Sequence, residues 1–171
     1  TGTQNAIETL PGEVTLAFAP HGNSLDRWMQ AARRGGHEIV LQLPLEPFDY
    51  PNVDPGRDTL TVSSGPAENT DRLLRTLSRI TNYVGVVNYM GARFTQDEAA
   101  MSSLMAELGR RGLMFVDDGT SSRSIADRLA PANGAPFAAA QATLDAQRDR
   151  AAILERLDDL ERIARAQGFA I

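Results

Sequence analysis

Hydrogen-bonding side chains are gathered directly after a segment that is typical of a buried strand. The apolar run Tyr83–Val87 is followed by Asn88, Tyr89 and Arg93, which carry an amide, a phenol and a guanidinium. In α/β folds, ligands bind at the carboxyl ends of parallel strands, so these groups are placed where a substrate would meet them. Arg93 could bind a substrate anion, but an ion pair with Glu46 or with Asp117 is the commoner arrangement.

A second concentration of polar groups is Asp117–Asp118–Gly119, at the end of another apolar run. Carboxylates in such a position can act as general acids and bases or as metal ligands. Successive residues of a strand point to opposite sides of the sheet, so one pocket receives both carboxylates only if the backbone bends. One of the two could instead cap the helix expected to begin near Ser121.

The remaining candidates are single residues. Gln42 lies in the second half of a predicted strand, Glu46 and Asp145 directly follow predicted strands, and His21 lies in a loop on the same side. His37 follows two glycines at the amino end of its strand, where a structural histidine is the commoner interpretation. The chain has no cysteine and no nucleophile elbow, phosphate loop, dinucleotide fingerprint or HExxH motif. This excludes thiolate chemistry and leaves acid–base or metal-assisted hydrolysis.

Short apolar strands that alternate with amphipathic helices must position these groups. Strands are predicted at residues 14–20, 38–45, 83–90, 113–119 and 137–144. Helices are predicted at 3–10, 24–36, 69–80, 95–112, 122–130 and 146–168, with Asn69 or Thr70 capping the third of these helices and Thr95 the fourth. Near-continuous apolar strands indicate a parallel sheet covered on both faces. Periodicity alone leaves open a doubly wound sheet or a β/α barrel.

The connection at residues 44–69 is unusually long and is rich in Pro, Gly and Asp. Because it follows the carboxyl end of a strand, a functional or mobile loop is expected. The chain opens on a helix and closes on the apolar FAI, so we expect a single, incomplete domain over residues 1–171 that is truncated at both ends.

The charge of the chain argues against a nucleic-acid partner. Its 171 residues carry a net charge of −5 with a pI near 5.0, whereas binding to a phosphate backbone requires a basic surface. The paired arginines at 33–34 and 110–111 lie in the last turns of predicted helices, where positive charge complements the helix dipole. No apolar run approaches the ~20 residues needed to span a membrane.

Several segments, taken in order, resemble the divergent polysaccharide deacetylase family, also known as the YibQ family. They are residues 9–23, 36–47, 85–95, 111–124 and 153–171, which together extend over nearly the whole chain. The resemblance implies a distorted β/α barrel of the glycoside hydrolase/deacetylase superfamily, related to NodB-type carbohydrate esterases. It also implies a periplasmic or otherwise extracytoplasmic setting, in which any membrane attachment would come from an anchor outside this chain.

The resemblance assigns roles to particular residues. Matching positions include His37, Glu46, Asn88, Asp117, Asp118 and Asp145. Relatives commonly read GHEILLHMPMEP and NNHMGS, and this chain has Gln42 and Tyr89 where those two motifs place their later histidines. A carboxamide is a poor zinc ligand, and a phenol with a pKa of about 10 must lose its proton to bind zinc. The resemblance to the family implies a zinc ion with His37 as a ligand. The two substitutions, in contrast, favour hydrogen bonds to sugar hydroxyls.

Two functions follow from the residues and the resemblance together. One is a hydrolase that removes acetyl groups from an envelope polysaccharide, with Asp117, Asp118 and Arg93 as catalytic residues. Substrate-binding residues would be Gln42, Glu46, Asn88, Tyr89 and Asp145. The alternative is a carbohydrate-binding or cell-envelope interaction domain that keeps the fold and has lost the metal. A metal-free hydrolase that uses carboxylates is a third hypothesis.

Overall fold

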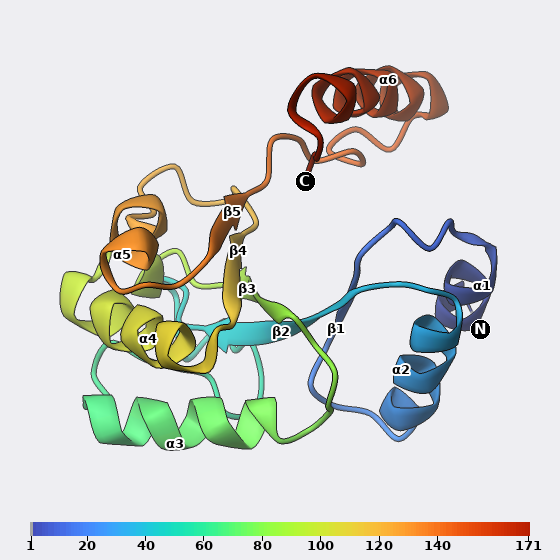
Figure 1. Cartoon of the computed structure of the whole chain (residues 1–171). Coiled ribbons are helices and arrows are strands. Elements are labelled where there is room, and N and C mark those ends of the chain that lie inside the picture. The colour runs from blue at the N-terminus through green and yellow to red at the C-terminus, as the bar shows by residue number, and fades with distance from the viewer. Residues whose placement is uncertain (1) are drawn as a thin grey trace.

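A computed structural model of the chain describes residues 2–171 (Figure 1). Its strands are β1 (Leu16–Phe18), β2 (Ile39–Leu45), β3 (Gly85–Met90), β4 (Met114–Asp117) and β5 (Phe137–Ala139). Its α-helices are α1 (Gly2–Thr9), α2 (Leu25–Arg34), α3 (Pro66–Leu77), α4 (Glu98–Arg111), α5 (Ala126–Ala132) and α6 (Arg150–Gln167), and the 3₁₀ turn η1 (Phe94–Gln96) precedes α4. The expected alternation of strands and helices is confirmed, although β1, β4 and β5 are shorter than the apolar runs suggested.

The five strands form one parallel sheet in the order β1-β2-β3-β4-β5. A doubly wound sheet reverses its strand order at a switch point, and this sheet does not. The order is that of a β/α barrel and agrees with a NodB-like fold. Among residues 2–171, β1 and β5 do not pair with each other, so the described strands do not close a barrel.

The two faces of the sheet differ in burial. Leu41, Leu43 and Leu45 alternate along β2 and are fully buried. They join a core that includes apolar residues of α3, α4 and α5, which flank the sheet in Figure 1. On the opposite face Gln42 is half-buried, and Tyr89 of β3 is 41% exposed. Strand alternation therefore turns the leucines to the helices and places Gln42 and Tyr89 on the opposite face, beside the buried Val40 and Pro44 of β2.

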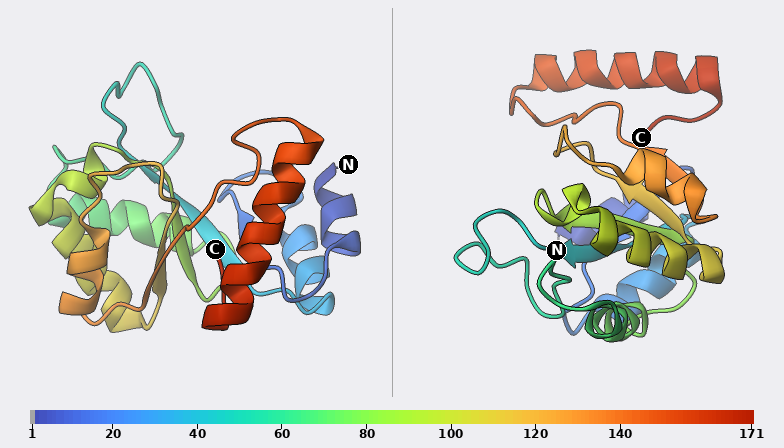
Figure 2. Two further views of the ribbon diagram at one scale, coloured as in Figure 1. Left: turned by 90° about the horizontal axis from the view of Figure 1, so that it is seen from above. Right: turned by 90° about the vertical axis from the view of Figure 1, so that its left-hand side faces the viewer.

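Helix α6 stands apart from this core. Figures 1 and 2 show it on one side of the molecule, away from the sheet, and no residue of α6 is buried. Its apolar residues Leu154 and Leu157 are 49% and 45% exposed. No helix among residues 2–171 is long and apolar enough to cross a membrane.

Two predicted helix starts are wrong. Helix α3 begins at Pro66 with Gly65 as its N-cap, because proline lacks the amide hydrogen that the first turn leaves unsatisfied. Asn69 instead lies inside α3. Helix α4 begins after Asp97, whose carboxylate accepts the amide of Ala100 at 2.8 Å, whereas Thr95 lies in η1.

The arginine pair at the end of α4 does more than complement the helix dipole. Arg110 and Arg111 both bind the carboxylate of Glu107, the latter at 2.6 Å. Burial raises the pKa of Glu107, but hydrogen bonds from Arg111 and Arg110 outweigh it, so the net pKa lies below its ordinary value. A charged Glu107 can thus remain buried against the core.

Candidate functional site

Two adjoining cavities open at the carboxyl ends of the first three strands. The strand-end cavity has a volume of about 180 Å³ and is lined by Ala19, Pro20, His21, Gln42, Pro44, Pro55, Arg57 and Tyr89. The arginine cavity has a volume of about 300 Å³ and is lined by Pro20, His21, Arg57, Asp58, Arg75, Thr76, Ser78 and Arg79. Pro20, His21 and Arg57 line both, so one ligand can occupy both spaces.

Strand register brings Gln42 and Tyr89 into the strand-end cavity. In the parallel pair of β2 and β3, Gln42 lies opposite Val87 and Pro44 lies opposite Tyr89. Residues two apart on a strand share a face, so Gln42 and Tyr89 project from the same side of the sheet. Neither side chain has a hydrogen-bond partner among residues 2–171. An amide and a phenol are therefore available to a ligand in the same space.

Two loops complete the strand-end cavity. His21 is exposed in the loop after β1 and lines both cavities. Pro55 and Arg57 come from the long connection between β2 and α3, whose tip projects from the body of the molecule in Figure 2. The expectation that this connection contributes to a site therefore agrees with its position.

The base of the long connection is fixed by Glu46, which is 3% exposed. Its carboxylate accepts a hydrogen bond from Arg93 at 2.8 Å and another from the amide of Val62 at 2.5 Å. Its backbone carbonyl accepts the amides of Arg93 and Phe94. Of the alternatives for Arg93, the ion pair with Glu46 is confirmed. Glu46 and Arg93 line neither cavity, and their roles in substrate binding and catalysis stay predictions.

Asn88 joins the ends of β3 and β4, and the side chains of the two aspartates bond the loop that follows β4. The Oδ1 atom of Asn88 accepts the amide of Asp118 at 2.8 Å. Asp117 is 6% exposed and accepts hydrogen bonds from the amide of Gly119 and the hydroxyl of Ser124. Asp118 accepts the amide and hydroxyl of Thr120. These contacts order the loop after β4, and a catalytic role for either aspartate stays a prediction.

His37 and Asp145 lie away from both cavities. His37 is buried, and its Nδ1 and Nε2 atoms lie 2.7 and 3.2 Å from the carbonyl oxygens of Val14 and Ile7. Neither ring nitrogen is therefore directed at a metal site, and the ring joins α1 to the segment before β1. Asp145 is exposed in the connection between β5 and α6. The predicted strand at 137–144 ends at Ala139, so Asp145 does not lie at a strand end.

The described residues do not suit the zinc ion that the family resemblance implies. Zinc sites require about three or four nitrogen, sulfur or carboxylate ligands. The strand-end cavity offers one imidazole, from His21, beside the carboxamide of Gln42 and the phenol of Tyr89. No group of three His, Cys, Asp or Glu side chains that could hold a metal occurs among residues 2–171.

Sequence reasoning missed most of the arginine cavity. Arg57 and Asp58 are in the long connection, and Arg75 and Arg79 are at the end of α3 and just beyond it. The length of the connection was the one signal that pointed to this region. A charged residue on an amphipathic helix is ordinarily solvated, so its sequence position does not reveal a cavity.

Fold and site together define a β/α protein with cavities beside the carboxyl ends of its parallel strands. The model of the divergent polysaccharide deacetylase family matches residues 1–171, and the chain belongs to that family.

Solved and curated relatives agree with this membership. A crystal structure of an uncharacterized protein from Agrobacterium tumefaciens C58 superimposes with a TM-score of 0.93 at 54% identity, over 99% of this chain and 69% of that one. An uncharacterized protein of Haemophilus influenzae is 26% identical over 97% of this chain and 59% of its own length. Escherichia coli YibQ is 24% identical over 98% of this chain and 52% of its own length. The chain thus spans between half and three fifths of these two curated relatives.

Proposed function

We propose that this deacetylase-like protein binds an envelope carbohydrate in the strand-end cavity through hydrogen bonds rather than through a metal. The observation that carries the proposal is the pairing of Gln42 and Tyr89 in one cavity, each without a partner among residues 2–171. The amide can donate to and accept from sugar hydroxyls, and the phenol can do the same while its ring covers an apolar sugar face. Family membership supports an extracytoplasmic location, which we include in the proposal.

Truncation of the two side chains should weaken glycan binding. Gln42→Ala and Tyr89→Ala are each expected to reduce affinity for chitin-type oligosaccharides about tenfold, because each removes hydrogen bonds of about 1–1.5 kcal/mol and the phenol also removes contact area. Titration calorimetry on the full chain measures this. Gln30→Ala, which removes an exposed amide on α2 outside both cavities, is the matched control. Equal losses in Gln30→Ala and Gln42→Ala would contradict the assignment.

A variant designed to bind metal tests whether Gln42 and Tyr89 are the reason that the cavity lacks a metal site. Gln42→His combined with Tyr89→His would add two imidazoles to a cavity that already contains His21. We expect no stoichiometric metal in the wild-type protein and about one zinc ion per chain in the double variant, measured by elemental analysis after purification without chelator. Stoichiometric metal in the wild-type protein would overturn the metal-free proposal.

Deacetylation is the second candidate function, and His21 is the observation that favours it. Hydrolysis of an acetyl group needs a base for the attacking water and a donor for the oxyanion. An imidazole and a phenol line the same cavity and are of the right types for these tasks. Acetate release that is lost in His21→Asn but resists chelators would support a metal-free hydrolase, whereas glycan binding without acetate release supports the binding domain.

A further inference from the structure

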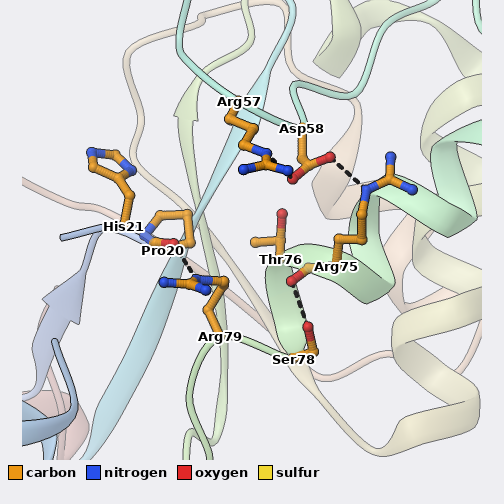
Figure 3. Close-up of a pocket in the computed structure, with 8 residues that line it drawn as sticks. All are labelled: Pro20, His21, Arg57, Asp58, Arg75, Thr76, Ser78 and Arg79. Atoms are coloured by element: carbon orange, nitrogen blue, oxygen red, sulfur yellow. Dashed lines mark hydrogen bonds and ion pairs between the residues drawn. The ribbon is translucent and has the colours of Figure 1, made fainter. Parts of the chain in front are cut away.

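The arginine cavity is built from elements that are far apart in the sequence. Pro20 and His21 follow β1, Arg57 and Asp58 belong to the long connection, and the segment at the end of α3 supplies the rest. Figure 3 shows these side chains around one space, with Thr76 between Asp58 and Arg79. The space adjoins the strand-end cavity, so it lies beside the proposed sugar site.

Positive charge in the arginine cavity is only partly neutralised. Asp58 pairs with Arg75 at 2.6 Å and with Arg57 at 3.7 Å. Arg79 donates through Nε to the carbonyl oxygen of Pro20 at 3.1 Å and forms no ion pair among residues 2–171. Three guanidinium groups against a single carboxylate leave two positive charges in excess, although the whole chain carries −5. This local excess favours an anionic ligand.

A second, independent feature is the hydroxyl of Thr76. The residue is 2% exposed, and its Oγ1 atom has no hydrogen-bond partner among residues 2–171. A buried hydroxyl without a partner costs about 1–3 kcal/mol, so a threonine at such a position normally bonds a neighbouring carbonyl. The side chain lines the arginine cavity, but Oγ1 itself is shielded from solvent, so a ligand oxygen can accept its hydrogen only after a small rearrangement of the cavity wall.

We propose that the arginine cavity binds the carboxylate or phosphate group of an acidic carbohydrate whose neighbouring sugar ring lies against Gln42 and Tyr89. This inference rests on the proposed function, because it names the class of carbohydrate for the same pair of cavities. Guanidinium groups bind both kinds of oxyanion through paired hydrogen bonds, and Thr76 supplies one further donor. The preferred ligand would therefore be an acidic glycan, and a neutral chitin-type oligosaccharide would occupy the strand-end cavity alone.

The test compares sugars that differ only in the group at C6, which is neutral in one and anionic in the other two. Glucose, glucuronate and glucose 6-phosphate are titrated into the full chain at low ionic strength and followed by nuclear magnetic resonance. We expect at least one of the two anionic sugars to bind about tenfold more tightly than glucose, and the tighter of them identifies the anionic group. Arg79→Gln should return that affinity to the level of glucose. Arg128→Gln, which removes an exposed arginine of α5 outside both cavities, should not.

A conservative change separates ligand binding from folding. Thr76→Val keeps the shape of the side chain and removes a hydroxyl that has no partner in the unliganded protein. It is expected to weaken binding of the anionic sugar several-fold while the thermal midpoint stays the same or rises. A lower midpoint with unchanged affinity would show that the hydroxyl serves the fold and does not bind a ligand.

Failure of this inference differs from failure of the proposed function. Equal affinity for the three sugars, or equal losses in Arg79→Gln and Arg128→Gln, would overturn the acidic-glycan proposal even if Gln42 and Tyr89 bind chitin oligosaccharides. Binding of inorganic phosphate that depends on Arg79, without binding of any sugar, would overturn both proposals.

Discussion

Replacement of Glu46 by alanine is expected to lower the free energy of unfolding by about 3 kcal/mol and to weaken ligand binding in both cavities. The carboxylate is buried and accepts one hydrogen bond from a guanidinium and one from the backbone, and bonds to a charged group are worth about 1.5–3 kcal/mol each. Its loss leaves the amide of Val62 without this acceptor. Chemical denaturation of the full chain measures the change.

The effect on binding follows from the position of Glu46. The residue ties the start of the long connection to Val62, near its end, and ties both to the turn at Arg93. Leu60 is also held, through an isolated bridge to Leu45. Arg57 and Asp58 lie between these anchors, so a looser base is expected to displace them and lower the affinity for anionic sugars.

Glu98→Ala is the matched control for Glu46→Ala. Glu98 is 70% exposed and pairs with Arg128 at 3.3 Å, so its removal should change the free energy of unfolding by less than about 0.5 kcal/mol. A Glu46→Ala protein that is as stable as Glu98→Ala would show that the carboxylate is not an anchor. A stability loss with unchanged sugar binding would show that Arg57 keeps its place without it.

The sequence singled out Gln42 and Tyr89 because they lie near predicted strand ends and because the family resemblance places histidines at these positions, and strand register explains why they share a cavity. Alternation along β2 and β3 decides which side chains share a face, and the carboxyl ends of parallel strands lie at one edge. The same regularity could not separate Asp117 from Asp118 in role. The hydrogen bonds of Asp117 to Gly119 and Ser124 depend on how the loop after β4 folds back, which no periodic pattern encodes.

The long connection shows a different limit of sequence interpretation. Its length and composition predicted a functional loop, but not that Thr59 and Thr61 would be buried or that Asn69 would bond Thr61 and Ser64. These contacts join residues several positions apart, and the spacing between the partners follows no helical or strand period from which they could be predicted. The arginine cavity is a consequence of that folded loop meeting α3, so it appears only in three dimensions.

Gly91→Ala is expected to lower the free energy of unfolding by about 3 kcal/mol, for two separate reasons. The backbone φ of Gly91 is +97°, a left-handed conformation that costs other residues about 1–2 kcal/mol. A Cβ atom at Gly91 would also lie 2.6 Å from the Cβ atom of Leu45, which is fully buried, and overpacking of this kind costs about 1–3 kcal/mol. Thermal and chemical denaturation measure the total.

Gly112→Ala separates the two causes, because Gly112 has a φ of +67° and a Cβ atom added there would meet no other atom within 4 Å. It should lose only the conformational part, about 1 kcal/mol, and the difference between the two variants then measures the clash with Leu45. The clash matters for function because Gly91 lies two residues after Tyr89, directly after the end of β3, and its carbonyl accepts the amide of Thr95. If Gly91→Ala is no less stable than Gly112→Ala, the backbone at the turn shifts to relieve the contact with Leu45 at no cost in stability. Glycan affinity in Gly91→Ala should then match the wild-type value. If the larger loss is found, a parallel loss of glycan affinity is expected, because the strand end that presents Tyr89 would be displaced.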